Sequence, residues 1–349
     1  MRKSIFFSLA ATIIFCSIPA FCDTIHIPAD QPTIQAGIDA AVDGDLVFVE
    51  YGTFVENIDF LGKSITVRSE WGADMTAIDG DPGGCVVTFS SGENGASILD
   101  GFQIRNGYQN EGGGIVILDA DPTIMNCRIQ DNSASDAGGG IYCVNGDPTI
   151  MNCTISGNLV SQSTGVGGAM YCRQSSPRLT NCIISENKAV GFMYSGIVFG
   201  ESCSPVITNC TIFGNGSNYS EDTCGILLWS NCTAQITNCI IWEDLPIDMV
   251  GLDYESSTVM VSYSDIKGGE NGVQVCPDCV LNWLEGNIDA DPRFVGSGNY
   301  HLLPSSPCIN AGTDAGIYTD IDGNIRPQGG GFYMGAYESS GSCFLGLVM

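Results

Sequence analysis

Five copies of one short motif decide the fold of this chain: Pro122-Thr-Ile-Met-Asn-Cys127, Pro148-Thr-Ile-Met-Asn-Cys153, Pro177-Arg-Leu-Thr-Asn-Cys182, Pro205-Val-Ile-Thr-Asn-Cys210 and Ala234-Gln-Ile-Thr-Asn-Cys239. Their cysteines are separated by 26, 29, 28 and 29 residues. The first four copies continue as x-Ile-x-x-Asn, and a glycine stands nine residues before the start of every copy. A repeat of this length is typical of stacked supersecondary units.

Each copy consists of short β-branched segments closed by Gly, Asn or Pro, a pattern typical of strands joined by turns. No window within a repeat has helical periodicity, which disfavours helical repeat proteins. The second copy predicts three strands, around 140–143, 149–151 and 153–155. We therefore expect an all-β fold, a right-handed parallel β-helix (a single-stranded solenoid) whose coils stack about 4.8 Å apart.

Two columns of equivalent residues are expected to stack along this solenoid. Asparagine tolerates the left-handed turn conformation and can bond its neighbours through its side-chain amide; the predicted ladder comprises Asn126, Asn152, Asn181, Asn209 and Asn238. Small thiols suit a narrow interior; the cysteine column comprises Cys127, Cys153, Cys182, Cys210 and Cys239. Buried free thiols are favoured over disulfides between coils, because a strand spacing of about 4.8 Å is wide for a disulfide, and over a metal site, which needs convergent thiolates.

The ends of the chain divide it into four regions. Residues 1–22 read as a signal peptide, with a basic start and an apolar stretch. Residues 23–80 contain the N-terminal cap, a short amphipathic helix from about Thr33, and the first coils. Residues 81–268 hold the β-helix repeats, and residues 269–349 form a C-terminal coil or capping region. We expect no membrane span in the mature chain, and an exported protein: extracellular, at the cell surface or periplasmic.

The composition limits the classes of molecule that the chain is expected to bind. The chain has 349 residues, with 12 Lys and Arg against 39 Asp and Glu, a net charge of −27. This balance argues against nucleic acid as a partner, because binding phosphates needs clustered basic residues. Two of the 17 cysteines lie in the predicted signal peptide, which leaves an odd number. At least one thiol is then free or pairs with another molecule.

The sequence resembles secreted bacterial β-helix proteins of the pectin-lyase-like superfamily. The opening of that group is similar to His26-Ile-Pro-Ala-Asp-Gln-Pro-Thr-Ile-Gln35, and its first full coil to Ile98-Leu-Asp-Gly-Phe102. The C-terminal region, through Asp289-Ala-Asp-Pro292, Ser306-Pro-Cys-Ile-Asn-Ala-Gly312 and Gly335-Ala-Tyr-Glu338, resembles the "choice-of-anchor Q" module. The resemblance implies the fold and an exported compartment, but one fold hosts many functions.

One outward column of side chains is the candidate groove, because enzymes of this superfamily act along one parallel sheet. The column six residues before each motif contains Tyr142, Tyr171 and Phe199, between Val116 and Leu228. Three outward aromatic rings would form a stacking platform for sugar rings or a partner. The candidate ligand-binding residues are Tyr142, Tyr171, Phe199, Asp119, Asp147 and Glu201, and Arg173 is the candidate base of a calcium-assisted lyase. The alternative is a packed face, covered by a loop such as 159–166.

Two further motifs could hold a metal or a bridge. Asp320, Asp322 and Asn324 place oxygens at alternate positions, so calcium is the cofactor to consider, although the family's own turn explains them better. Cys276-Pro-Asp-Cys279 favours a local disulfide over zinc, because no second cysteine pair accompanies it. Cys308 and Cys343 are further candidate bridge formers.

Three functions remain open. The leading hypothesis is a non-enzymatic exported protein for adhesion or recognition, with a polysaccharide or a cell-surface partner as its ligand. The first alternative is a calcium-dependent polysaccharide lyase or related carbohydrate-active enzyme using the aromatic face. The second is a structural envelope or assembly component, joined through odd cysteines or exposed edges.

Overall fold

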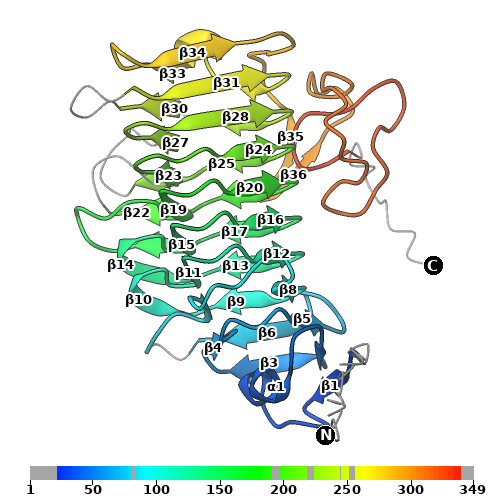
Figure 1. The fold of residues 1–349 in the computed structure, drawn as a ribbon. Coiled ribbons are helices and arrows are strands. Elements are labelled where there is room, and N and C mark those ends of the chain that lie inside the picture. The colour runs from blue at the N-terminus through cyan, green and yellow to red at the C-terminus, as the bar shows by residue number, and fades with distance from the viewer. Residues whose placement is uncertain are drawn as a thin grey trace, which may run out of the picture.

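The chain winds into a parallel β-solenoid in the computed structural model, which describes residues 22–80, 83–190, 196–217, 224–243, 245–250 and 256–338. Successive coils stack along one axis, with the N-terminus at one end (Figure 1). Strands of neighbouring coils pair in parallel; for example, Thr123–Met125 pairs with Thr149–Met151. The predicted all-β right-handed β-helix is confirmed.

Four parallel sheets make up the wall of the solenoid. Sheet A contains β1 (Thr24–Ile27), β2 (Leu46–Val49), β5 (Thr66–Ser69), β8 (Ile98–Asp100), β12 (Thr123–Met125), β16 (Thr149–Met151), β20 (Arg178–Thr180), β24 (Val206–Thr208), β28 (Thr233–Thr237), β31 (Thr258–Ser262) and β34 (Val280–Trp283). Sheet B contains β3 (Gly52–Val55), β6 (Thr76–Asp79), β9 (Gln103–Arg105), β13 (Arg128–Gln130), β17 (Thr154–Ser156), β21 (Ile183–Ser185), β25 (Thr211–Phe213), β29 (Ile240–Trp242) and β32 (Asp265–Ile266). Sheet C contains β4 (Ile58–Asp59), β7 (Val87–Phe89), β11 (Ile115–Leu118), β15 (Ile141–Val144), β19 (Met170–Arg173), β23 (Ile197–Phe199), β27 (Cys224–Leu228), β30 (Leu245–Met249) and β33 (Val273–Gln274). Sheet D contains β10 (Tyr108–Glu111), β14 (Ser133–Ala137), β18 (Leu159–Val160), β22 (Lys188–Ala189) and β26 (Gly216–Ser217).

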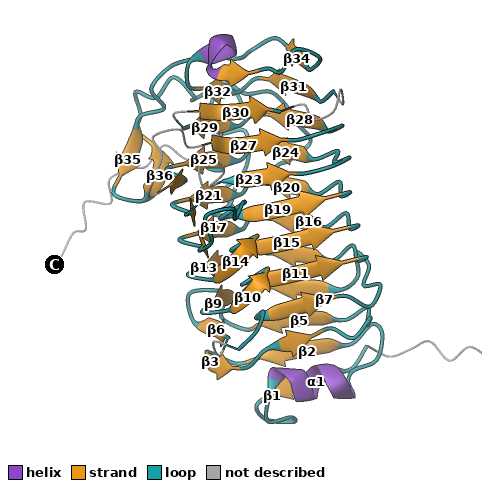
Figure 2. Cartoon of the chain, turned by 90° about the vertical axis from the view of Figure 1, so that its left-hand side faces the viewer, coloured by secondary structure: helices purple, strands orange, loops and turns teal. Residues whose placement is uncertain are grey.

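The three strands predicted for each repeat correspond to sheets C, A and B, in that order along the chain. Sheet D was not predicted; its strands are short and follow those of sheet B in the middle coils. Figure 2 shows sheet C facing the viewer, with β10 and β14 of sheet D beside it. The predicted cover 159–166 begins with β18 and ends at Val166, which bridges to Ala137 of the preceding coil.

One continuous core fills the solenoid because alternate residues of each strand point inward. Isoleucines and valines of sheets A, B and C are fully buried along its length. The turn between sheets A and B consists of a single asparagine in the left-handed conformation, for example Asn152 with φ 53°. Asparagine suits this turn because its short polar side chain relieves the cost of a positive φ.

The N-terminal end is closed by α1 (Ile34–Ala40), close to the predicted start. The Thr33 hydroxyl caps it by accepting the Ala36 backbone N–H at 3.1 Å. Ile34 and Ile38 are buried, whereas Val42 lies beyond the helix and is 64% exposed. The cap covers apolar core that the end of a solenoid would otherwise expose.

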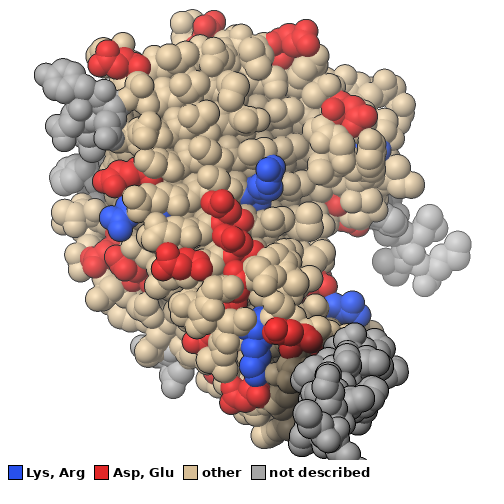
Figure 3. All heavy atoms as spheres, viewed as in Figure 1, with Lys and Arg blue, Asp and Glu red and all other residues tan. Residues whose placement is uncertain are grey.

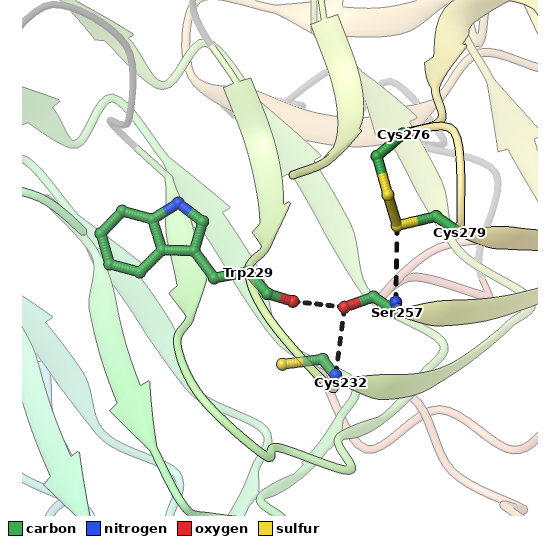
Figure 4. The surroundings of a disulfide bond; sticks show 5 residues. All are labelled: Trp229, Cys232, Ser257, Cys276 and Cys279. Carbon is green, nitrogen blue, oxygen red and sulfur yellow. Dashed lines mark hydrogen bonds between the residues drawn. A yellow bond between two sulfur atoms is a disulfide. The ribbon is translucent and has the colours of Figure 1, made fainter. Parts of the chain in front are cut away.

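A second small structure closes the other end. The last coil contains the 3₁₀ helix η1 (Gly269–Gly272), β33 and β34. The predicted disulfide between Cys276 and Cys279 is confirmed, and Figure 4 shows how it meets the coil below. The Ser257 N–H donates to the Cys279 sulfur at 3.4 Å, and the Ser257 hydroxyl donates to the Trp229 carbonyl. Cys308, the other described bridge candidate, is a buried free thiol.

After the last coil the chain turns back and packs against the outside of the solenoid (Figure 1). This segment, residues 290–338, is called the side module below; it contains β35 (Phe294–Gly296) and β36 (Asn299–Leu302). Phe294 and Tyr300 pack on Phe213 of sheet B, with ring centroids 5.5 and 5.6 Å from it. Inside the module, Arg326 and Glu338 form a fully buried ion pair at 2.9 Å. Among the described residues, no helix is long and apolar enough to cross a membrane.

Candidate functional site

Tyr142 and Tyr171 are direct neighbours on the outer face of sheet C. They lie in register on β15 and β19, both half-buried. Their rings stack nearly parallel, with centroids 5.5 Å apart and an interplanar angle of 12°. Val116, the preceding member of the predicted column, is in the same register but is buried.

Phe199 and Leu228 do not continue this column, so this part of the prediction is wrong. Phe199 pairs with Cys172, and Leu228 pairs with Phe199; both side chains are fully buried in the core. The segment from sheet C to the motif is one residue longer here, running from Phe199 to Pro205 instead of from Cys172 to Pro177. Because side chains alternate along a strand, one extra residue moves an inward position into the place predicted to face outward.

The outward neighbours are therefore Val198 and Leu227. Val198 pairs with Tyr171, and Leu227 pairs with Val198. These two side chains pack with Val166 and Tyr171 in one apolar cluster on the outside of sheet C. The exposed part of the predicted platform is consequently reduced to the two tyrosines, with apolar packing on one side of them.

A tight turn precedes each of the two tyrosine strands. The turns begin with Gly138 and Gly167, which have φ values of 63° and 69°. A Cβ atom at Gly138 would collide with the carbonyl oxygen of Ile141, the residue before Tyr142. Glycine is required here because it alone has neither the Cβ atom nor the cost of a positive φ.

Charged groups surround the two phenol groups. Burial, together with the neighbouring Glu111 carboxylate, raises the pKa of Tyr142 to about 12. Burial also raises the pKa of Tyr171, the Arg173 guanidinium opposes this, and Glu201 adds to it. Both hydroxyls stay protonated at neutral pH and can donate hydrogen bonds. Glu111 was not among the predicted residues, because it comes from β10 of the unpredicted sheet D.

The two aspartates of the candidate site are used within the protein. The Asp119 carboxylate accepts a hydrogen bond from the Asn145 side chain at 3.1 Å. The Asp147 carboxylate accepts the Ser176 backbone N–H of the next coil at 2.6 Å. Both carboxylates thus connect adjacent coils. Within the described ranges, no three His, Cys, Asp or Glu side chains converge as a metal site requires.

The candidate calcium loop is a hydrogen-bonded turn in the side module. Asp320 is buried, and one of its oxygens accepts the backbone N–H groups of Asp322 and Asn324 at 3.0 and 2.7 Å. Its other oxygen accepts the Glu338 N–H and the Asn324 side-chain amide. With both oxygens engaged by its own chain, Asp320 connects this turn to the C-terminal end of the module.

The two predicted columns lie at the corner between sheets A and B. All five cysteines of the column are buried and free, and burial raises the pKa of Cys153, Cys182 and Cys210 well above the ordinary thiol value. These last three thiols are therefore protonated and unreactive at neutral pH. The asparagines bond one another only in the lower coils: Asn152 donates to Asn126 at 3.3 Å, and Asn181 donates to Asn152 at 3.1 Å. Higher up, Asn238 bonds Thr313 of the side module instead.

A second ladder, not predicted, lies inside the solenoid at the corner after sheet B. We call it the inner ladder; it consists of Asn132, Asn158, Asn187, Asn215 and Glu243, all buried. Each amide donates to the side-chain oxygen of the next coil; the Asn158–Asn187 and Asn187–Asn215 bonds measure 2.9 and 2.8 Å. The asparagine of the x-Ile-x-x-Asn pattern is the residue that forms this ladder. In the fifth coil Glu243 takes the place of asparagine, and its carboxylate accepts from the Asn215 amide at 2.9 Å.

Comparisons with known proteins agree with this architecture. A family model described as "Right handed beta helix region" matches residues 76–241. Among solved structures, pectate lyase Pel9A is 18% identical with a TM-score of 0.50, covering 87% of this chain and 90% of that one. A pectin methylesterase from carrot is 13% identical with a TM-score of 0.44, covering 79% and 91%. No curated protein sequence is significantly similar to the chain. The chain therefore has the right-handed parallel β-helix fold, which it shares with this pectate lyase.

Proposed function

We propose that this chain is an exported β-helix protein that recognises carbohydrate, at the cell surface or outside the cell, without cleaving it. The observation that carries the proposal is the stacked pair Tyr142 and Tyr171 on the outer face of sheet C. Tyrosine combines an apolar ring with a hydroxyl, which suits the alternating apolar and hydroxyl-bearing surfaces of a sugar.

The groups around the pair add polar contacts. Glu111 and Glu201 can accept hydrogen bonds from sugar hydroxyls, and Arg173 can donate to them. A carbohydrate-active enzyme, the pectate lyase, has the same fold, which supports a carbohydrate ligand for this chain. Export rests on the basic start and apolar stretch of residues 1–22, of which residues 1–21 lie outside the described part of the chain.

The rival function is a polysaccharide lyase with Arg173 as its base. The position of Arg173 favours a lyase, because its guanidinium lies close enough to Tyr171 to counteract part of the rise in the pKa of that phenol that burial causes. A calcium-assisted lyase also needs carboxylates that converge on a metal. Asp119 and Asp147 instead bond groups of the next coil, which is why we favour binding.

A binding experiment separates these functions. Glycan-array binding and calorimetry should show that Tyr142→Ala with Tyr171→Ala abolishes carbohydrate binding, while wild-type protein releases no product. The matched control is Tyr108→Ala, which removes a 48% exposed tyrosine from sheet D. Ultraviolet-absorbing unsaturated products from a uronate polymer, lost in Arg173→Ala, would establish the lyase. Binding unchanged in the double variant would refute the role of the tyrosine pair.

A further inference from the structure

The side module covers only part of the corner between sheets A and B. The asparagine ladder predicted from the motif, Asn126 to Asn238, is called the outer ladder below. Its members Asn181, Asn209 and Asn238 are buried. Two of them bond the module: Asn181 donates to the Thr319 carbonyl at 2.8 Å, and Asn238 to the Thr313 carbonyl at 2.7 Å. In the two coils nearer the N-terminus, Asn126 is exposed and Asn152 half-exposed. The lower edge of the module therefore ends beside side-chain amides that are accessible to solvent, although they also bond one another.

A cavity of about 210 Å³ lies at this edge. Three segments distant in sequence line it: a loop before β6, two successive coils, and the side module. The lining residues are Ala73, Asp74, Asn126, Cys127, Arg128, Asn152, Thr154, Ile321, Asp322 and Tyr337. We call it the seam cavity. Because all three segments are needed to form it, it exists only in the folded protein.

The module side of the cavity is held in a fixed arrangement. His301 Nε2 lies 2.8 Å from an Asp322 carboxylate oxygen, and His301 Nδ1 lies 2.6 Å from the Asn299 side-chain oxygen. The His301 ring stacks on Tyr337, with centroids 3.7 Å apart and an interplanar angle of 25°. Asp322 is thus oriented by a ring that is itself packed, as a preorganised binding group requires.

The solenoid side supplies the opposite charge and further polar groups. Arg128 of β13 forms an ion pair with Asp74, and both side chains stay substantially exposed, at 45% and 70%. Asn126, Asn152 and Thr154 add amide and hydroxyl groups beside them. The face of the molecule seen in Figure 3 carries more acidic than basic side chains.

We propose that the seam cavity binds one neutral sugar residue, such as the terminal pyranose of a polysaccharide. Its volume equals about seven water molecules at roughly 30 Å³ each, which is below the range of about 300–1,000 Å³ for larger ligands. Neighbouring hydroxyls of a pyranose can donate to Asp322 and accept from Arg128 or the amides. The lining contains two carboxylates and one guanidinium, with His301 behind Asp322, so we expect a neutral sugar to be preferred over a uronate.

This site is separate from the tyrosine pair, since it lies at the corner of sheets A and B rather than on sheet C. It does not depend on the function proposed for that pair. A bound metal ion is disfavoured because Asp322 faces His301, and Asp74 faces Arg128. The two sites together would allow one chain to contact a polysaccharide at two faces.

Saturation-transfer NMR and calorimetry with the methyl pyranosides of glucose, galactose and mannose test this proposal. We expect one of them to bind with a dissociation constant near about 1 mM, typical of a ligand this small. Asp322→Asn and Thr154→Val should each weaken it about tenfold or more. The uronic acid of the sugar that binds should bind about tenfold more weakly than that sugar itself.

The controls distinguish this site from the fold and from the tyrosine pair. Asp314→Asn changes an exposed module carboxylate outside the cavity and should leave binding unchanged, as should Tyr142→Ala with Tyr171→Ala. Circular dichroism checks that the variants are folded. No binding of any pyranoside, or equal binding by Asp322→Asn and Thr154→Val, would overturn the proposal. Calcium alone binding in a manner that Asp322→Asn abolishes would also overturn it.

Discussion

Replacing Asn158 with alanine should destabilise the solenoid strongly, because the inner ladder has no access to water. Asn158 is fully buried and makes four side-chain hydrogen bonds. Its oxygen accepts the backbone N–H and the amide of Asn132, and its amide donates to Ile129 and Asn187. All of these partners are buried too.

The magnitude follows from the partners that lose a bond. Each hydrogen bond contributes about 1 kcal/mol net, so the loss of four bonds gives about 4 kcal/mol. The Asn132 amide keeps its bond to the Ile104 carbonyl, and the Asn187 side-chain oxygen keeps the backbone N–H at position 158. Asn152→Gly in the outer ladder is the matched control. It removes two bonds, at 3.3 and 3.1 Å, that are partly exposed, and glycine keeps the positive φ. We expect about 1 kcal/mol from that change.

Urea unfolding followed by circular dichroism measures both variants. A solenoid can unfold in stages, so the two transitions are compared by midpoint and by slope. The reasoning is refuted if Asn158→Ala lowers the midpoint no more than Asn152→Gly does.

Three further predictions concern buried groups elsewhere. Phe199→Ala should cost about 3 kcal/mol or more in unfolding free energy, since the ring is fully buried; a loss below about 1 kcal/mol would mean that the side chain faces outward after all. Glu338→Gln leaves the buried Arg326 guanidinium without its carboxylate partner and should cost about 3–5 kcal/mol, seen as early proteolytic loss of the side module; equal protease resistance would contradict the role of this pair. Burial raises the pKa of Asp265 to about 6, above its ordinary value of about 3.9. Because the folded state then binds the proton more tightly than the unfolded state, the free energy of unfolding should fall as pH rises from about 4 to about 6. Asp265→Asn should flatten this pH dependence in thermal unfolding, and an unchanged slope would count against the assignment.

The motif predicted sheets A and B well because one asparagine makes the whole turn between them. With no room for a longer connection, the spacing from Ile150 through Asn152 to Cys153 recurs in all five copies. Sheet C is different, since the connection after it varies by one residue in length. Counting back from the motif therefore put Tyr142 and Tyr171 in the right place and Phe199 in the wrong one.

The position of the side module could not be predicted from the sequence, for a different reason. Its contacts join residues far apart in the chain: Asn181 meets Thr319, and Thr211 accepts the Ala336 N–H. No local pattern reports such distant pairs. The partners of Asp322 and Arg128 in the seam cavity depend on the same long-range packing and were not foreseen.

The side module also limits how this protein can change in length. It bonds to Asn181, Thr211 and Asn238, which belong to three successive coils. Duplicating or deleting a coil among these would shift every contact by one strand spacing, about 4.8 Å, and break them. Among the described residues between the N-terminal cap and β17, none hydrogen-bonds the module, although the seam cavity lies at its edge. We therefore expect gain or loss of a coil by unequal recombination to be tolerated toward the N-terminus. Beneath the module such a change should destabilise the protein, because the contacts of the module fix the number of coils that it covers.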